Sequence, residues 1–406
     1  MNNKNNKFKD NVLNAFKKVS PSKIEIENKK VYKKYLNDHK NLFFWKLNFP
    51  VSLFDGKKII DFGCGTGEVD IILNNWGAIV NGFDFNDDSI KRAKDLRDKF
   101  KVNKNKLKFT IGDIDSFKIQ KNAYDMAVSF GVIAHVPNQK RMFQKMVDST
   151  KNGGFVILGY VEDSGLIQRL FHRAIVRANS QKDENEIHRI ALNIFGEHIS
   201  RSVKYGGRTA KSVINDYLIN PAYFGISCKK LDNWADEFGL KFYSTYPNTN
   251  LPFVVDSPYL EPISRKSNVY RIYLSLHRLR YIFAQNEDID VFSNFFSEFG
   301  KLEYQIENTI SDLTAMLQCD TISYLDVDEQ KRNWGIILRD IRKSSELSLD
   351  HIFDLLESTV EELIRLLEII VKSKQSNDKI DLTDINRLLF NGYNGLGTTY
   401  TIFYKP

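Results

Sequence analysis

A chain of 406 residues, 42% of them hydrophobic, can bury the cores of two domains, which excludes an intrinsically disordered protein. It has no run of about 20 apolar residues, which excludes a membrane-spanning helix, and no apolar signal-peptide core near its N-terminus. Its three cysteines have the spacing of neither a metal site nor a disulfide framework, so we expect no metal site and a cytoplasmic location.

The net charge of +7 is concentrated near the N-terminus, where residues 1–60 carry 14 lysines against five acidic residues. Such a segment can attract RNA or another anionic partner, or it can be a solvated arm, and both interpretations stay open. The polar residues 1–7 are predicted to be disordered. Apolar residues at helical spacing predict helices at 8–19 and 26–46, so residues 1–50 form a predicted basic helical cap.

The most informative stretch is 57–67, which reads Lys-Lys-Ile-Ile-Asp-Phe-Gly-Cys-Gly-Thr-Gly. Its apolar run predicts a buried strand, and its three alternating glycines predict a tight turn that comes close to another group. Apolar residues at helical spacing predict a helix over 68–76. A strand, a glycine-rich turn and a helix in this order commonly bind a nucleotide-like ligand in an α/β sheet.

The spacing within this turn narrows the class of ligand. A dinucleotide fingerprint has two residues between its second and third glycines, whereas here only Thr66 separates them. Asp61, at the end of the strand, would repel a phosphate and could orient an ammonium. The turn therefore suits a nucleoside with a cationic amino-acid tail, the alternative being a glycine-rich turn of another α/β protein.

Strands and helices alternate regularly after this turn. Strands are predicted at 78–83, 107–111, 124–130 and 155–160, with a helix at 139–150 and a turn at 151–154. This alternation predicts a parallel sheet. Asp84 lies about 20 residues beyond the glycine turn, where an acid can bind two ribose hydroxyls.

Together these segments resemble the class I Rossmann-like S-adenosylmethionine-dependent methyltransferases. The shared features are the acid-x-Gly-x-Gly-x-Gly turn, Asp84, Asp113, the apolar-His-Val-Pro segment ending at Pro137 and the Lys-x-Gly-Gly turn. The resemblance implies that S-adenosyl-L-methionine is the cofactor, with the Asp113 side chain at the adenine amino group and the Ile114 amide at the ring. The implied cofactor-binding residues are Asp61, Gly63, Cys64, Gly65, Gly67, Asp84, Phe85, Asp113, Ile114 and Phe130.

The resemblance also implies the fold class, which is α/β with a doubly wound, mostly parallel seven-stranded sheet. Strand six is predicted at 240–246 after a helix at 228–239, and strand seven at 398–404. Helical insertions are expected after strand five and between strands six and seven, the alternative to the second being a separate C-terminal helical domain. The predicted units are 1–50, 51–160, 161–226, 227–254, 255–392 and 393–406.

The two helical regions have different predicted roles. Residues 161–226, with an amphipathic stretch at 165–177 and a second helix at 187–199, are predicted to form a lid over the substrate. The polar residues 180–187 are predicted to be a loop. An apolar stripe over 349–371 predicts a long helix that packs in a core or, less often, forms an oligomer contact.

The implied reaction is methyl transfer to a nucleophile, for which orientation of the two groups supplies much of the rate. His135, just after the fourth strand, is the candidate base for a hydroxyl acceptor, the alternative being a packing role. Position 129–132 reads Ser-Phe-Gly-Val and lacks the Asn/Asp-Pro-Pro-aromatic stretch of enzymes that methylate nucleic-acid bases on exocyclic amines. We therefore expect a small-molecule, lipid or glycan acceptor, methylated most often on oxygen. The alternatives are an RNA-modifying enzyme and a non-catalytic cofactor-binding scaffold.

Overall fold

The computed structural model describes residues 12–17, 23–180, 183–220, 223–249, 265–283, 302–319, 322–344, 350–381 and 398–406. The predicted disorder at 1–7 lies outside these residues. Of the predicted helix at 8–19, residues 12–17 are described, and they are helical. No helix within the described residues is long and apolar enough to cross a membrane.

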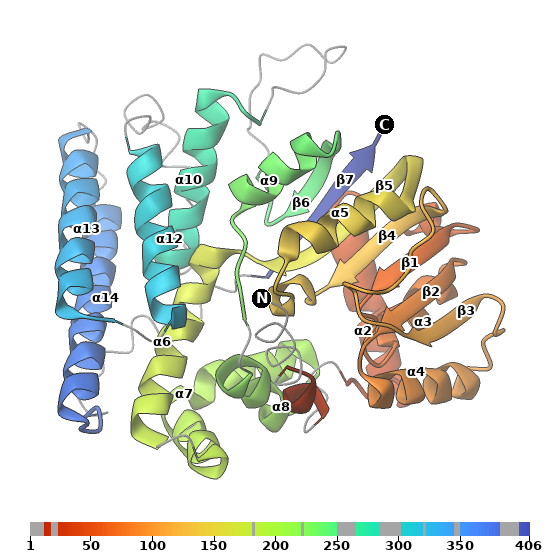
Figure 1. The fold of residues 1–406 in the computed structure, drawn as a ribbon, viewed down its shortest axis with the longest axis horizontal. Coiled ribbons are helices and arrows are strands. Elements are labelled where there is room, and N and C mark those ends of the chain that lie inside the picture. Colours follow the sequence, from red (N-terminus) through yellow and green to blue (C-terminus); the bar gives the residue numbers. More distant parts are fainter. Residues whose placement is uncertain are drawn as a thin grey trace.

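The centre of the molecule is a seven-stranded sheet in the order β3-β2-β1-β4-β5-β7-β6 (Figure 1). The strands are β1 Lys58–Phe62, β2 Ile79–Asp84, β3 Leu107–Ile111, β4 Tyr124–Phe130, β5 Thr150–Val161, β6 Lys241–Tyr246 and β7 Thr398–Lys405. The first five strands are parallel, and β7 lies antiparallel between β5 and β6. This arrangement confirms the predicted fold class, including the terminal strand.

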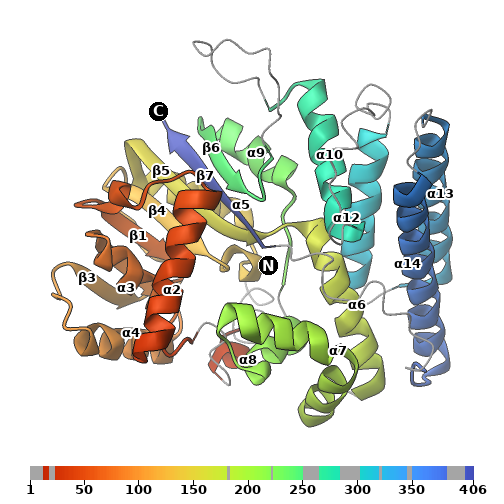
Figure 2. The ribbon, with the colours of Figure 1, turned by 180° about the vertical axis from the view of Figure 1, so that it is seen from behind.

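Each face of the sheet is covered by helices because successive side chains of a buried strand point to opposite faces. On one face, Ile59 and Val128 pack with helices α3 Glu68–Asn75 and α4 Asp87–Lys99. On the other face, Ile60 and Ala127 pack with α5 Gln139–Ser149 and α9 Cys228–Glu237. Figure 1 views the sheet from the side of α5 and α9, and Figure 2 views it from behind, where α2 Lys29–Asn41 crosses in front.

The predicted turn at 151–154 is wrong, since these residues lie within β5. They form an irregularity in the pairing with β4, where Tyr124 is paired with Thr150 and Met126 with Phe155. Gly153 adopts a φ of 77°, which accounts for a glycine at this position. The sequence signal for a turn therefore marked a bulge in the strand.

The predicted helix at 26–46 consists of α2 and a short π-helix, η1 Leu42–Lys46. After β5 come α6 Asp163–Ser180, α7 Glu184–Gly206, α8 Ala210–Ile214 and η4 Asn215–Ile219. Helix α7 begins at Glu184, so the loop predicted at 180–187 is shorter than expected. Between β6 and β7 in the sequence are α10 Asn268–Phe283, α12 Glu303–Cys319, α13 Tyr324–Ser344 and α14 Asp350–Ser376. These four helices stand beside the sheet, with α6 running between them and it (Figures 1 and 2).

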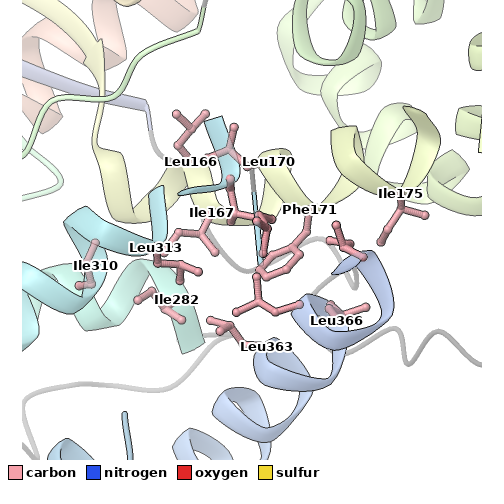
Figure 3. Close-up of a cluster of buried hydrophobic side chains, with 14 of the residues drawn as sticks. Leu166, Ile167, Leu170, Phe171, Ile175, Ile282, Ile310, Leu313, Leu363 and Leu366 are labelled. Carbon is pink, nitrogen blue, oxygen red and sulfur yellow. The ribbon is translucent and has the colours of Figure 1, made fainter. Parts of the chain in front are cut away.

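Helix α6 is the centre of a second hydrophobic core. Leu166, Ile167, Leu170 and Phe171 pack among side chains of α10, α12 and α14 (Figure 3). The predicted stripe at 349–371 is part of this core, so its core role is confirmed for the described side chains. On the other side of α6, Arg169 and His172 are also buried, because α7 and η4 cover that side.

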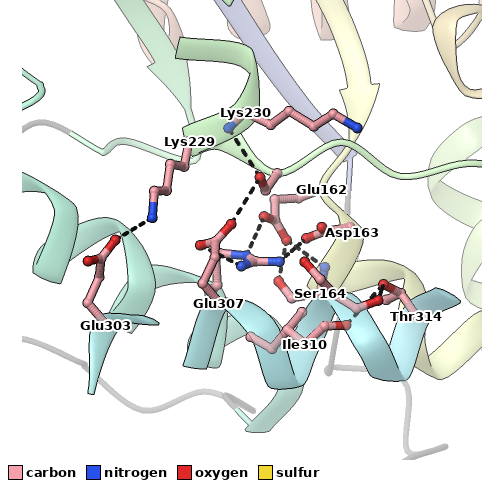
Figure 4. A network of polar contacts seen from close by, with 12 residues as sticks. Glu162, Asp163, Ser164, Lys229, Lys230, Glu303, Glu307, Ile310 and Thr314 are labelled. Carbon is pink, nitrogen blue, oxygen red and sulfur yellow. Dashed lines mark hydrogen bonds and ion pairs between the residues drawn. The ribbon is translucent and has the colours of Figure 1, made fainter. Parts of the chain in front are cut away.

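One buried cation joins this helical layer to the sheet. Arg278 of α10 is fully buried, and its guanidinium lies 3.2 Å from Glu162 Oε1, 2.6 Å from Asp163 Oδ1 and 2.7 Å from Glu307 Oε2. Glu162 directly follows β5, Asp163 begins α6 and Glu307 belongs to α12 (Figure 4). The Ser164 hydroxyl donates a further short hydrogen bond to Glu162. The end of β5 is therefore tied to three helices by charge-assisted hydrogen bonds and ion pairs.

Candidate active site

A cavity of about 460 Å³ opens at the carboxyl ends of β1, β2 and β4, where open α/β sheets bind their ligands. Most of the predicted site residues line it, although they come from distant parts of the sequence. The predicted residues in its wall are Asp61, Gly63, Cys64, Gly65, Asp84, Phe85, Asp113, Ile114, Phe130 and His135. Gly67, the third glycine of the turn, does not line the cavity.

The three glycines of the turn are required by its backbone. Gly63, Gly65 and Gly67 have φ values of 82°, 53° and 82°, a region that other residues rarely adopt. A Cβ atom on Gly63 would lie 2.5 Å from Val132 Cγ2, and one on Gly67 would lie 2.8 Å from Phe109 Cζ. Gly63 thus allows the turn to approach the loop after β4, and Gly67 allows α3 to approach β3.

Asp84 holds the turn from the end of the neighbouring strand. Its Oδ2 accepts a hydrogen bond from the Gly65 amide at 3.0 Å, and its Oδ1 accepts one from the Asn86 amide at 2.8 Å. Burial raises the pKa of Asp84, and the amides of Asn86, Gly65 and Phe85 oppose this change. The carboxylate is therefore anchored in the cavity wall by backbone donors.

Three further carboxylates surround the base of the turn. Asp61 is buried in β1, and Glu68 and Asp70 are buried in the first turn of α3. Asp61 Oδ1 and both carboxylate oxygens of Asp70 are buried without a hydrogen-bond partner, which is costly unless a cation or proton reaches them. Burial raises the pKa of Asp61 to about 7, and burial with the charge of Asp61 raises the pKa of Asp70 well above its usual value.

These acids do not constitute a metal site. Across the described ranges, no group of three or more His, Cys, Asp or Glu side chains is placed to hold a metal ion. Glu68 is also engaged elsewhere, since it accepts hydrogen bonds from the Thr66 hydroxyl at 2.5 Å and from the Ile24 amide at 3.2 Å. The base of the turn is thus an anionic recess suited to an organic cation.

The loop after β3 forms another wall of the cavity. Asp113 Oδ1 accepts a hydrogen bond from the Asp115 amide at 2.8 Å, which turns the chain at this point. Lys145 of α5 donates from Nζ to the carbonyl oxygens of Ile114 at 2.6 Å, Asp115 at 2.8 Å and Phe117 at 3.3 Å. Sequence reasoning missed Lys145, whose only signal was a lysine among the apolar positions of a predicted helix.

The N-terminal segments cover the cavity. Phe16, Tyr35 and His39 are in its wall, in agreement with the expectation that these helices lie over the cleft. Tyr32 of α2 lies outside this wall and packs against Phe100 at a centroid distance of 5.1 Å. The rings of Phe16 and His135 pack edge to face at a centroid distance of 5.2 Å, so the N-terminal segment contacts the candidate base.

His135 lies on a short 3-10 helix, η3 Ile133–His135, directly after β4. Its Nδ1 is 3.3 Å from Asn220 Nδ2, and its Nε2 is 3.9 Å from Asp216 Oδ1. The orientation of the Asn220 amide selects the tautomer of neutral His135. If the amide NH₂ faces Nδ1, then Nδ1 accepts a hydrogen bond and the ring proton is on Nε2. If the amide oxygen faces Nδ1, then the ring proton is on Nδ1 and Nε2 is free to accept a proton.

Beyond His135 the cavity is lined by five residues that sequence reasoning missed, namely Arg169, Arg208, Asp216, Tyr217 and Tyr223. We call them the distal cluster. They come from α6, the segment before α8, η4 and the loop before α9, all within the predicted lid at 161–226. Their only signal was arginine and tyrosine in helical segments, a pattern equally typical of solvated surfaces.

A known protein family matches the part of the chain that forms most of this site. Residues 53–216 match the model of a family described as a methyltransferase domain. This match covers the sheet from β1 to β5, the glycine turn, Asp84, His135 and most of the distal cluster.

Curated relatives match a shorter region. Ubiquinone biosynthesis O-methyltransferases from Coxiella burnetii (strain RSA 493) and Shewanella sp. (strain ANA-3) are 30% and 29% identical over 99 and 107 residues, which are 24% and 26% of this chain. The chain spans only 41% and 44% of the length of these relatives.

Solved structures give weaker likenesses. A Pyrococcus horikoshii protein is 22% identical with a TM-score of 0.32 over 38% of this chain and 69% of its own. A Synechocystis magnesium protoporphyrin IX methyltransferase with bound SAH is 15% identical with a TM-score of 0.33 over 55% of this chain and 81% of its own. Over residues 53–216, the chain is therefore similar to a methyltransferase domain.

Proposed function

We propose that the cavity binds S-adenosylmethionine and that the protein transfers its methyl group to an oxygen atom of a small-molecule acceptor. The observation that carries this proposal is the buried carboxyl group of Asp61 in the cavity wall beside the glycine turn, whose Oδ1 accepts no hydrogen bond from a donor group. An isolated buried carboxylate is strongly disfavoured, and an ammonium group of the cofactor would compensate it. When bound, the cofactor supplies an electrophilic methyl group on a sulfonium.

The remaining residues fit the other parts of the cofactor. Asp84, anchored at the end of β2, would receive the ribose hydroxyls. The loop at 113–115, held by Lys145, would receive the adenine. Phe85 and Phe130 in the same wall offer apolar surface to the ring and to the sulfonium end. Cys64 is small, and burial raises the pKa of its thiol well above the usual value, so it remains a neutral packing group.

With the amide oxygen of Asn220 turned toward Nδ1, His135 can accept the proton of an acceptor hydroxyl at Nε2. It lies in the cavity wall at the end of β4, and the nearby carboxylate of Asp216 would stabilise the imidazolium that forms. Similarity to ubiquinone O-methyltransferases over 99 residues supports oxygen as the methylated atom.

Calorimetric titration with S-adenosylhomocysteine and S-adenosylmethionine tests the cofactor site. We expect micromolar binding by the wild type and a loss of at least about tenfold in Asp84→Asn, because hydrogen bonds to a charged group are lost. The matched control is Asp95→Asn, which removes an exposed carboxylate on α4 and should bind as the wild type does. Absence of binding by the wild type would reject the proposed function.

Replacement of His135 tests its role, once a metabolite screen with mass-spectrometric detection has supplied an acceptor. In His135→Gln we expect kcat to fall by about 10²–10⁴ while the Kd of S-adenosylhomocysteine stays unchanged. An unchanged kcat would show that His135 is a packing residue.

A further inference from the structure

The cavity has opposite charges at its two ends. Around the glycine turn its wall contains the carboxyl groups of Asp61, Glu68 and Asp84. At the distal cluster it contains two guanidinium groups, Arg169 and Arg208, against one carboxylate, Asp216. A ligand that fills the cavity therefore contacts an acidic end and a basic end. Because both ends are shielded from water, each end favours ligand groups of the opposite charge.

Arg169 is held rigidly within the distal cluster. Its side chain is 6% exposed, its Nη1 donates a hydrogen bond to the Tyr223 hydroxyl at 2.5 Å, and its guanidinium lies 3.9 Å from the centroid of the Tyr217 ring. These two tyrosines orient the guanidinium, which also interacts electrostatically with Asp216. A planar guanidinium fixed in this way is suited to bidentate binding of a carboxylate.

Arg208 also lies near Tyr217, with its guanidinium 5.7 Å from the ring centroid. Its Nη2 donates to Asp216 Oδ2 at 2.8 Å, while Asp216 Oδ1 faces His135 Nε2 at 3.9 Å. Asp216 thus links the second arginine to the candidate base. The cationic groups and His135 are parts of one connected constellation on the acceptor side of the cavity.

The rest of this end is aromatic. Tyr217 and Tyr223 of the distal cluster are joined in the cavity wall by Phe16 from the N-terminal helix and by Tyr400 from β7. Aromatic faces bind flat, apolar ring systems over a large area. The wall therefore combines surface for a ring with cations for an anionic substituent.

We propose, on the basis of the methyl transfer proposed above, that the acceptor is an aromatic carboxylic acid whose carboxylate is bound by Arg169 and Arg208. Its ring lies against the aromatic wall of this end, and its hydroxyl lies toward His135. A cationic acceptor is disfavoured by the same two arginines. The distal cluster thus determines which acceptors the enzyme accepts, and the acidic end binds the cofactor independently.

Three 4-substituted phenols with an anionic, a neutral and a cationic substituent test this proposal, namely 4-hydroxybenzoate, 4-hydroxybenzamide and 4-hydroxybenzylamine. Their binding to protein loaded with S-adenosylhomocysteine is measured by ligand-observed NMR titration. We expect the anionic acid to bind at least about tenfold more tightly than the neutral amide, because a charged acceptor strengthens the hydrogen bonds of a guanidinium, and the cationic amine to bind weakest.

Variants assign the preference to the distal cluster. Arg169→Gln should abolish the preference for the acid over the amide, Arg169→Lys should retain part of it, and Arg177→Gln, the same change farther along α6, should keep it. Tyr223→Phe removes the hydroxyl that orients Arg169 but keeps the charge, so it should weaken the preference without abolishing it.

Equal binding of acid and amide by the wild type, including no binding of either, would overturn the proposal, as would a preference that survives in Arg169→Gln. Titration of S-adenosylhomocysteine into every variant separates the two proposals. If the cofactor analogue binds and the charge preference is missing, only the acceptor proposal fails. If the analogue itself does not bind to the wild type, the proposed function fails, and with it the acceptor proposal that depends on it.

Discussion

Asp61 is the residue whose ionisation should control cofactor affinity. Its pKa is raised by burial to about 7, so near neutrality it exchanges between a neutral acid and a carboxylate. An ammonium binds the carboxylate form. We therefore expect the affinity for S-adenosylhomocysteine to rise as pH increases from 6 to 8, with release of a proton on binding that calorimetry in buffers of different ionisation enthalpy would detect.

The control for this prediction is 5′-methylthioadenosine, which lacks the amino-acid tail and should bind with an affinity independent of pH. In the ligand-free protein we expect the opposite dependence on pH, in this case for the free energy of unfolding. The unfolded acid titrates near 3.8 and the folded acid near 7, so the free energy of unfolding should fall as pH rises between about 4 and 7. Thermal melts with and without the analogue would detect both trends, and parallel pH profiles would contradict the assignment of Asp61.

Gly67 offers a second prediction at the scale of one residue. Gly67→Ala should destabilise the fold for two reasons, a φ of 82° and a Cβ atom 2.8 Å from Phe109 Cζ and 2.9 Å from Ala93 Cβ. Gly153→Ala has the same backbone penalty, at a φ of 77°, but no atom within 4 Å of the new Cβ. In urea unfolding we expect Gly67→Ala to lose about 1–3 kcal/mol more than Gly153→Ala. Equal losses would mean that α3 can move away from β3.

At the scale of elements, Arg278 should be essential for the joint between the sheet and the helical layer. Arg278→Met would leave Glu162, Asp163 and Glu307 without their shared cation, and breaking a buried pair in this way costs about 3–5 kcal/mol. Chemical denaturation would measure the loss. Adding Glu162→Gln should recover part of it, because one buried charge is removed. Lys331→Met, on the pair with Glu368 in which both side chains are about half exposed, is the control and should cost less.

The loss in Arg278→Met should also depend on pH. Burial already raises the pKa of Glu162 to about 8 in the presence of Arg278, and without this cation the pKa would rise further. The unfolded acid ionises near 4.5 in both proteins, so the difference in stability should be nearly constant at lower pH, and the variant should lose stability relative to the wild type as pH rises through about 8. A difference from the wild type that stays constant between about pH 7 and 9 would show that Glu162 does not take up the proton.

The elements of the sheet could be predicted from sequence because each has a local signal. Alternating helices and strands, and the β-branched and aromatic residues at 398–404, indicated β1 to β7. The turn predicted at 151–154 was wrong, because glycines that permit a bulge resemble glycines that end a strand. The burial of Arg169 and His172 on the polar side of α6 could not be predicted, because it depends on α7 and η4, whose packing has no local signal.

The site shows the same difference between residues that have a local sequence signal and residues that do not. Asp61, Asp84 and the glycines belong to contiguous motifs and could be identified from spacing. Asp70 and Lys145 could not, since they act through partners that only the folded chain brings near. The distal cluster is assembled from separate parts of 161–226, and the division of the chain into domains remains a prediction.

The position of β7 gives a prediction for the whole molecule. This strand pairs with β5 over 154–161 and with β6 over 241–246, so it is the only link between them within the described sheet. Deletion of residues 398–406 should therefore abolish cooperative unfolding in calorimetry and expose apolar surface to a hydrophobic dye. Alanine replacement of Lys405 alone, whose Nζ binds the carbonyl oxygens of Val147 and Thr150, should preserve the transition. A sharp transition in the deletion variant would contradict this role.

Because β7 lies more than 150 residues after β6 in the sequence, it also sets an order of events during synthesis on the ribosome. Strand β5 and strand β6 emerge early, each with an edge of unsatisfied backbone groups that can pair with another nascent chain. The helices α10 to α14 emerge before the strand that satisfies those edges, and they can pack on α6 while the sheet is still open. Closure of the sheet is then a late, long-range step, so a chain stalled before residue 398 should be a target for chaperones.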